Sequence, residues 1–144
     1  MFQWSDEHQM IREAVKRFVD EEIRPHVEAL EHGDMPPYDI LRKLFATFGM
    51  DAMARDRFAK QIAREKAVAA GEAEPAARSE GRGGGDSAMS LIPIIELCRV
   101  CPGMVTAMGV SMGLTSAAIM SKGTTRQKER WALDLLTMDK VGAW

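Results

Sequence analysis

The stretch PGMVTAMGVSMGLTSAAIMS, residues 102–121, contains no charged residue, and it decides how the rest of the chain must fold. Met, Val, Leu and Ile alternate there with Gly, Ala, Ser and Thr, and Gly123 follows as a stop signal. A helix without a polar face must be covered by the apolar faces of other helices. The pattern therefore predicts a central helix packed on all sides. Its small residues leave room for a ligand or for close helix approach.

A membrane-spanning helix is the alternative interpretation of the same stretch. About 20 apolar residues are enough to cross a bilayer, and Gly109 and Gly113 form a GxxxG pair. The high content of Gly, Ser, Thr and Ala makes the insertion energy weak. The other helices of the chain need an apolar element to cover, so the pattern favours a central helix of a globular domain.

Amphipathic helices are predicted before this stretch. Ser5 is expected to cap the first of them, Pro25 to kink or split it, and Gly33 to end it. Its apolar positions recur at helical spacing. They are Ile11, Val15, Phe18, Val19, Ile23, Val27 and Leu30.

Two further helices are expected before the middle of the chain. Asp34 with Pro36 and Pro37 marks the start of the second helix, and Gly49 marks its end. Asp51 is expected to cap the third. Residues 71–87, GEAEPAARSEGRGGGDS, offer too little apolar surface to offset the entropy of ordering. They are predicted to be a flexible linker or insertion.

The second helical block begins after this linker. Ser90 is expected to cap a helix that is apolar on nearly all sides and therefore buried, with Pro93 in its first turn. Residues 124–127, TTRQ, match a capping box and predict the start of the last helix. The side chains expected to point inward from it are Trp131, Leu135 and Leu136.

Composition limits the classes of function. The net charge of −2 gives no basic excess for binding nucleic acid, and Asp6, Glu7 and His8 interrupt the apolar start that a signal peptide needs. Two cysteines this close in sequence cannot staple the fold, so the chain is predicted to be reduced and cytoplasmic. The sequence predicts an all-α domain of about six helices over residues 1–140.

Three motifs have structural explanations that we prefer. Cys98 and Cys101 form a CxxC at the end of a predicted helix with no strand before it, and are expected to be buried and structural. The glycine run 81–85 lacks the Gly-Lys-Ser/Thr ending of a phosphate-binding loop. No histidine has a carboxylate three residues before it, which disfavours a ferritin-like metal site. We expect the histidines, His8, His26 and His32, to lie on the surface.

The order of several motifs resembles that of acyl-CoA dehydrogenases. Residues 21–25, EEIRP, resemble the family's opening helix, and residues 83–109 resemble its Gly-Gly, Glu-Leu and small-residue helix blocks. Residues 123–128, GTTRQK, followed by Trp131-Ala132-Leu133, are similar to the Gly-Thr-x-x-Gln-Lys-x-x-x-Leu signature. Residues 141–144, VGAW, resemble the residues before the flavin loop. Together these motifs extend over nearly the whole chain outside the linker.

The resemblance implies an N-terminal helical domain, with a β-barrel starting at residues 141–144 and a further helical domain following it. It implies an oxidoreductase of fatty acid metabolism that uses FAD for α,β-dehydrogenation of an acyl-CoA thioester. In that family the carboxylate base and most FAD contacts lie beyond this part of the protein, so the chain alone is expected to be inactive. Electron-transfer flavoprotein and a homo-oligomeric partner are implied as well.

Three residues take implied roles from the resemblance. Trp144 matches the aromatic position that begins the flavin-contacting stretch, whereas Thr106 and Gly109 match positions on the helix that lines the acyl-chain cavity. Some family members carry a carboxylate where Gly109 stands, so glycine suggests a cavity for long or bulky acyl groups. Close helix packing at Gly109 explains the same residue. The linker is longer and more charged than the family's usual connection.

A non-catalytic helical interaction module or partner subunit remains the alternative function. It would use the apolar face of the central helix against another chain. The residues that continue the reading frame would distinguish the two, because the enzyme requires a Thr-Glu-Pro flavin loop there.

Overall fold

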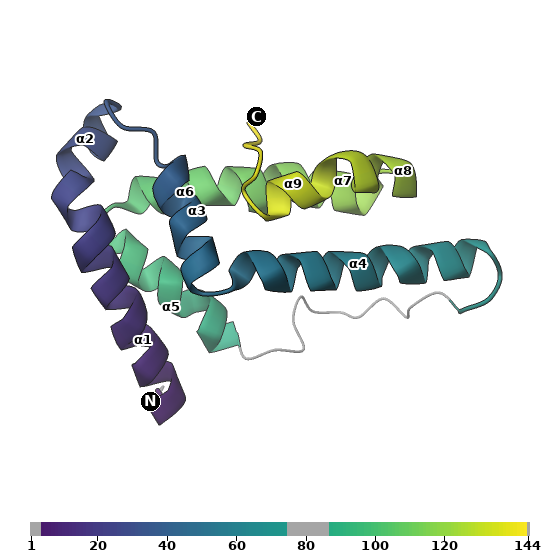
Figure 1. Cartoon of the computed structure of the whole chain (residues 1–144), viewed down its shortest axis with the longest axis horizontal. Helices are drawn as coiled ribbons and strands as arrows, with labels where there is room; N and C mark the ends of the chain where they lie inside the picture. Colours follow the sequence, from purple (N-terminus) through teal and green to yellow (C-terminus); the bar gives the residue numbers. More distant parts are fainter. Residues whose placement is uncertain (1–3, 75–86, 144) are drawn as a thin grey trace. The chain divides into compact units, whose positions relative to one another are not determined.

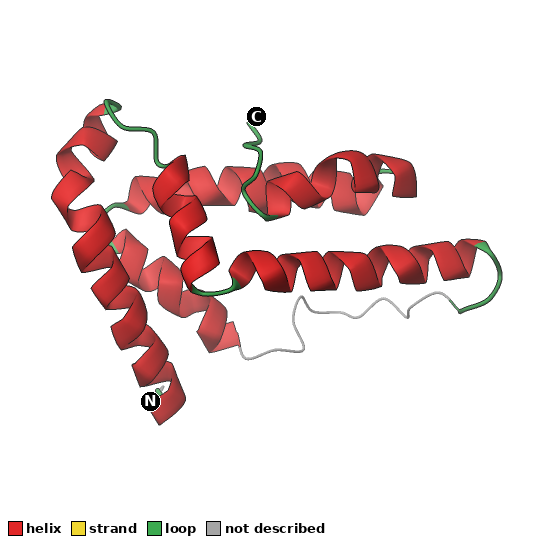
Figure 2. Ribbon diagram, in the orientation of Figure 1, coloured by secondary structure: helices red, strands yellow, loops and turns green. Residues whose placement is uncertain are grey.

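In the computed structural model, which describes residues 4–74 and 87–143, every regular element is a helix (Figure 2). The predicted all-α class is therefore confirmed. The chain divides into two compact units, the first made of residues 1–40 and 81–106 and the second of residues 41–80 and 107–144. Each unit thus combines two separate parts of the sequence.

The first unit is built mainly on the packing of α1 (Asp6–Phe18) against α5 (Ser87–Cys98), which lie side by side in Figure 1. As predicted, Ser5 caps α1, and its hydroxyl accepts from the backbone N–H of His8. The His8 ring returns a bond by accepting from the Ser5 N–H at Nδ1. His8 is buried, so the prediction of a surface histidine is wrong at this position, whereas His26 and His32 are exposed.

The continuation of α1 changes helix type before Pro25. A π turn, η1 (Val19–Ile23), and a 3₁₀ turn, η2 (Arg24–His26), replace the α-helix before α2 (Val27–His32) begins. Proline lacks the N–H that an α-helix needs and its ring displaces the carbonyl of the preceding turn, so the predicted break is confirmed. Gly33 ends α2 in the left-handed conformation, with φ 84°.

Helix α5 departs from its prediction in two ways. It starts at Ser87, so Ser90 is not its cap and Pro93 lies inside the helix instead of in its first turn. Ile92 and Leu97 are buried, but Leu91 and Ile95 are exposed. The prediction that this helix is buried on nearly all sides is therefore wrong. Of the predicted linker 71–87, residues 75–86 lie outside the described residues, whereas Gly71–Glu74 form a turn.

The second unit is organised along α4 (Met50–Ala69), beside which α8 (Thr125–Gln127) and α9 (Leu133–Leu136) pack (Figure 1). Helix α3 (Tyr38–Thr47) leads into it, and Gly49 makes the connection with φ 64°. Gly49 is also the residue that precedes α4, so the prediction that Asp51 caps this helix is wrong. Asp51 lies in the first turn, where a carboxylate favours the helix dipole.

A small apolar core joins α4 to α7 (Ser116–Lys122) and the last helix. Phe58, Ile62 and Ala132 are its buried members. Partly buried side chains surround them: Ile119, Met120, Leu133 and Leu136. Burying a large apolar side chain contributes roughly 1.5–3 kcal/mol, so this core helps to stabilise the unit.

The start of the last helical segment follows the predicted capping box. The Thr124 hydroxyl accepts from the Gln127 N–H at 3.3 Å, and Gln127 Oε1 accepts from the Thr124 N–H at 2.8 Å. The helix then continues through a π turn, η4 (Lys128–Ala132). Leu135 is buried as predicted, but Trp131 is 42% exposed and stacks under Arg130, so its inward prediction is wrong.

One helix among the described residues is long and apolar enough to cross a membrane, Pro102–Lys122, which comprises α6 (Pro102–Gly109), η3 (Val110–Thr115) and α7. Core helices of globular proteins meet the same criterion, so it is weak support for a membrane span. Met104, Ser111 and Ser116 are buried along it, but Leu114 is 54% exposed. The prediction of burial on all sides is therefore wrong within the described chain.

Candidate functional site

Thr106 and Gly109 lie one turn apart in α6, so they share one side of that helix. Thr106 is exposed and Gly109 is half-buried. A Cβ added at Gly109 would meet no described heavy atom within 4 Å, apart from its own helix backbone. No neighbouring helix of the described chain therefore packs directly against Gly109, and its predicted place in an acyl cavity stays a prediction.

The helix widens immediately after Gly109 into the π turn η3. The Ser116 N–H donates to the Ser111 carbonyl, five residues back, instead of to the residue four back. Such a turn displaces the usual backbone partners, and two hydroxyls satisfy the carbonyls. Thr115 Oγ1 donates to Val110 O at 3.0 Å, and Ser116 Oγ donates to Met112 O. Thr115 and Ser116 thus add side-chain hydrogen bonds to carbonyls of the π turn.

The segment after α9 crosses the helix at this π turn. The Gly142 N–H donates to Ser111 Oγ at 3.2 Å, and Ser111 is fully buried. A Cβ added at Gly142 would lie 2.6 Å from both Cβ and Oγ1 of Thr115, which real side chains do not tolerate. We call Ser111, Thr115 and Gly142 the C-terminal seat. Sequence reasoning missed this seat, because it joins residues 31 positions apart.

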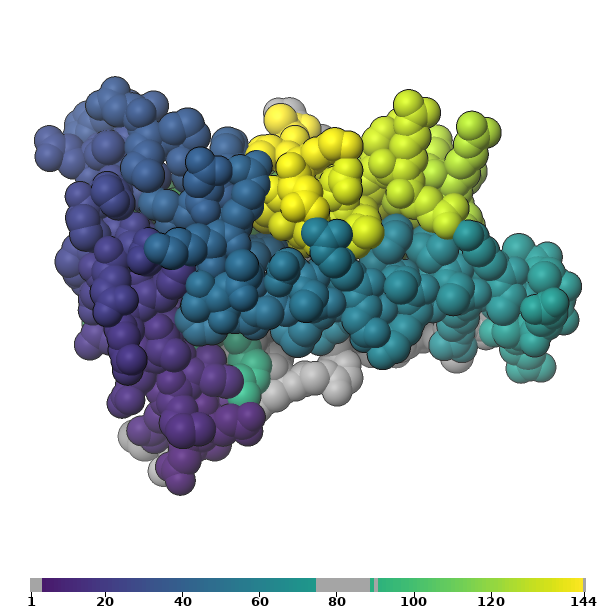
Figure 3. All heavy atoms as spheres, viewed as in Figure 1, coloured from purple at the N-terminus to yellow at the C-terminus, as the bar shows by residue number. Residues whose placement is uncertain are grey.

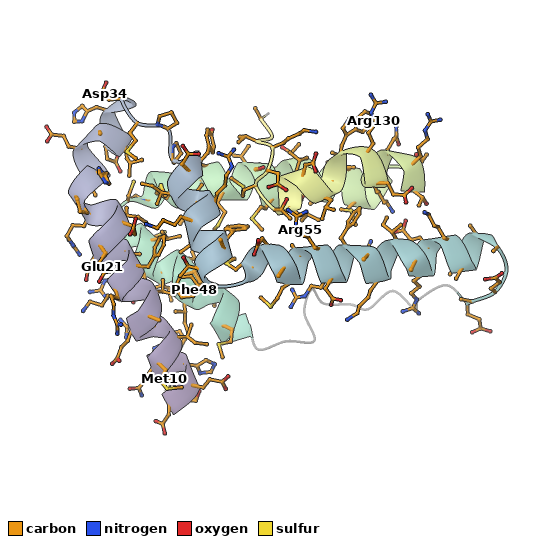
Figure 4. The ribbon with its side chains drawn as sticks, in the orientation of Figure 1. Met10, Glu21, Asp34, Phe48, Arg55 and Arg130 are labelled. Atoms are coloured by element: carbon orange, nitrogen blue, oxygen red, sulfur yellow. The ribbon has the colours of Figure 1, made fainter. Side chains whose placement is uncertain are left out.

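Two arginines hold the turn that leads from α9 to the seat. Arg42 Nε donates to the Met138 carbonyl at 2.8 Å, and Met138 has φ 62°. Arg55 donates to Asp139 Oδ2 at 2.7 Å, and in Figure 4 its side chain points from α4 toward this turn. A hydrogen bond from Thr137 and then the Arg55 guanidinium lower the pKa of Asp139. The turn is thereby fixed from α3 and α4.

The cysteine pair lies in the first unit. Cys98 is exposed and Cys101 is buried, so the prediction of two buried cysteines holds only for Cys101. Both thiols are free, and Cys101 Sγ donates to Glu31 Oε1 at 3.2 Å. Burial, and then the hydrogen bond to Glu31, raise the pKa of Cys101. Within residues 4–74 and 87–143 no three His, Cys, Asp or Glu side chains gather as a metal site.

The predicted site residues are only partly brought together. Thr106 and Gly109 share α6, and Gly109 adjoins the π turn of the C-terminal seat. Trp144, the predicted flavin contact, lies outside the described residues. The Ser111 hydroxyl accepts from the Gly142 N–H and the Thr115 hydroxyl donates to Val110 O, so both form hydrogen bonds within the protein.

Comparison with known proteins agrees with this helical arrangement. A family model described as acyl-CoA dehydrogenase, N-terminal domain, matches residues 5–54 and 48–139. A curated protein of Clostridium acetobutylicum, named acyl-CoA dehydrogenase, short-chain specific, is 22% identical over 143 residues. That match covers 99% of this chain and 32% of the relative, so the chain spans about a third of that protein's length. No solved structure matches the chain significantly.

The family match covers nearly all of the residues from the cap of α1 to the turn after α9. The sequence motifs that resemble the family lie within the same range, apart from residues 141–144. The chain belongs to the acyl-CoA dehydrogenase family, as its N-terminal helical domain.

Proposed function

We propose that this chain is the N-terminal domain of a flavin-dependent acyl-CoA dehydrogenase that catalyses α,β-dehydrogenation of an acyl-CoA thioester. The family match over residues 5–54 and 48–139 carries the proposal. The bound FAD would accept the hydride, and the catalytic base would come from a part of the parent protein that this chain does not include. The domain itself would line the acyl cavity through Thr106 and Gly109 and lead the chain toward the flavin at Trp144.

Toward FAD, we propose only an indirect role for the described residues, namely to hold the segment that precedes Trp144. Ser111 and Thr115 each form a hydrogen bond within the protein, from the Gly142 N–H and to Val110 O. They fit as support for residues 141–143, which precede the proposed contact at Trp144. We propose electron-transfer flavoprotein as the acceptor, a homo-oligomer as the assembled state and the cytoplasm as the location, all from family membership.

The protein expressed from its complete reading frame tests the function. We expect it to purify with a visible flavin spectrum and to reduce an artificial electron acceptor only when an acyl-CoA is added. The isolated 144-residue chain should hold FAD poorly and show no turnover. A folded, pure parent protein without flavin and without acyl-CoA-dependent reduction would reject the proposal. It would favour the alternative, a helical interaction module with exposed apolar residues such as Leu114.

The open space at Gly109 bears on the acyl group. We propose that a glycine here suits long or bulky chains, because no described atom lies within 4 Å of a Cβ built at this position. In the full-length protein, Gly109→Glu should shift the chain-length profile of kcat/KM toward shorter acyl-CoAs. One lost methylene contact is worth about 1 kcal/mol, so the preference should change by roughly fivefold for each carbon of the acyl chain that loses its contact. An unchanged chain-length profile would reject this proposal.

A further inference from the structure

Gly142, in the segment after α9, contacts the helix Pro102–Lys122 closely. Its N–H reaches a hydroxyl that is fully buried, at 3.2 Å. Its Cα lies so near Thr115 that a methyl group would meet Cβ, Oγ1 and Cγ2 of that side chain at 2.6–2.7 Å. The φ of Gly142 lies outside the left-handed range, so only space excludes a side chain there.

The surface that receives Gly142 is built by the π turn. Ser111 and Thr115 belong to η3, in which Ser116 N–H bonds to Ser111 O and Thr115 Oγ1 to Val110 O. The Thr115 side chain is therefore held by its own helix and cannot easily rotate away from an added methyl group. Gly142 is thus held by a hydrogen bond to Ser111 and by close contact with Thr115.

We propose that Ser111 and Thr115 are positioning residues, which set the path of residues 141–143 as the chain leaves the helical unit. The hydrogen bond to Ser111 fixes the position of Gly142 along the helix, and contact with Thr115 fixes its distance from the helix. Only the consequence for a flavin rests on the proposed function, since the seat itself is defined by contacts of this chain.

The experiment uses the full-length protein with four variants. Ser111→Ala removes the acceptor, and Gly142→Ala introduces the methyl group. The double variant Gly142→Ala with Thr115→Gly removes the three atoms nearest to the added methyl group. Gly113→Ala is the matched control, because it adds a methyl group on the same π turn where nothing lies within 4 Å.

Hydrogen exchange of the Gly142 amide is the first readout. We expect Ser111→Ala to speed it by about tenfold, the effect of losing one buried hydrogen bond. Gly142→Ala should speed exchange of the amides of residues 141–143. The double variant should restore most of their protection. Gly113→Ala should leave it unchanged. Unchanged exchange in both Ser111→Ala and Gly142→Ala, or no recovery in the double variant, would overturn the proposed seat.

Flavin retention after gel filtration is the second readout. If residues 141–143 lead to the flavin, Gly142→Ala should lower the bound fraction severalfold and the double variant should recover it. Altered exchange in a protein that never contains flavin would support the seat and reject the proposed function. An active flavoprotein in which Gly142→Ala behaves like Gly113→Ala would support the function and reject the seat.

Discussion

At the scale of single residues, Cys98 and Cys101 have different environments although they are three positions apart. Cys98 is exposed, whereas Cys101 is 2% exposed and donates to Glu31. Burial and the nearby carboxylate raise the pKa of Cys101, so the reactive thiolate is scarce at pH 8. Spacing alone does not reveal this difference, because a CxxC pair at a helix end can face the core with either thiol.

We therefore expect a thiol reagent at pH 8 to label Cys98 at least about tenfold faster than Cys101. The rates are measured on the single-cysteine variants Cys98→Ser and Cys101→Ser. Adding Glu31→Gln to Cys98→Ser should speed labelling of Cys101 modestly, because burial is the larger cause of its raised pKa. Equal rates for the two cysteines would contradict this description.

At the scale of elements, η4 is tied to α4 by charges along their shared side. Lys128 Nζ lies 2.9 Å from Glu65 Oε1, and Lys66 Nζ lies 2.6 Å from Glu129 Oε1. Figure 3 shows the adjacent surfaces of α4 and of the last helical segment in teal and yellow. Burial alone would raise the pKa of Glu65, but hydrogen bonds from Lys128 and Gln61 outweigh it, and the pKa is lowered.

The ion pair predicts a pH-dependent stability. A carboxylate with a lowered pKa stabilises the fold above its unfolded pKa of about 4.3, and the effect is lost as the pH falls through the folded pKa. Lys128→Met should cost about 0.5–1 kcal/mol of unfolding free energy at pH 7 and almost nothing near pH 2. Urea denaturation at both pH values measures the difference.

The matched control is Lys60→Met, because Lys60 and Asp56 form a solvent-exposed ion pair on α4, the helix that also carries Glu65. The Lys60 side chain is 75% exposed, against 12% for Lys128. Its replacement should change stability little at either pH. A pH-independent loss in Lys128→Met would point to packing of the lysine stem instead of to charge.

Element ends were predictable where one residue supplies the signal. The caps at Ser5 and Thr124, the break at Pro25 and the stop at Gly33 follow from local backbone chemistry and are confirmed. Asp51 was misjudged because the left-handed Gly49 determines where α4 begins. Trp131 was misjudged because helical spacing gives a face without saying how much of it another element covers.

The candidate site was less predictable than the fold. Gly109 was identified by resemblance alone, and its role in an acyl cavity stays a prediction. The seat of Gly142 on Ser111 and Thr115 depends on a tertiary contact, and on a π turn that no local pattern announces. Small residues in the uncharged helix were predicted to leave room for a ligand or for close helix approach, and two of them, Ser111 and Thr115, contact Gly142.

At the scale of the whole molecule, each compact unit depends on contacts between distant segments. In the first unit Arg12 Nε lies 2.7 Å from Glu96 Oε1, and the Glu96 side chain is 3% exposed. Arg99 contributes a longer contact of 3.4 Å to the same carboxylate. A buried carboxylate that loses its main partner is costly, so this pair controls how α1 and α5 stay associated.

Arg12→Ala should therefore lower the unfolding free energy by about 2 kcal/mol. Amide exchange should rise in α1 and α5 and stay unchanged in α4 and α9, which belong to the other unit. Arg24→Ala is the control, since the Arg24–Asp20 pair is exposed and should contribute at most about 0.5 kcal/mol. Equal losses from the two variants would show that burial of Glu96 is unimportant.

The position of the C-terminal seat also decides where this protein can be recombined with its relatives. One half of the seat, Ser111 and Thr115, belongs to η3 and precedes α7, α8 and α9 in the sequence. The other half, Gly142, follows these helices. A chimera joined between residues 116 and 141 would set one parent's serine and threonine against the other parent's backbone. A crossover placed before Val110 or after Ala143 inherits both halves from one parent, so hybrids joined at either point are expected to keep the seat intact.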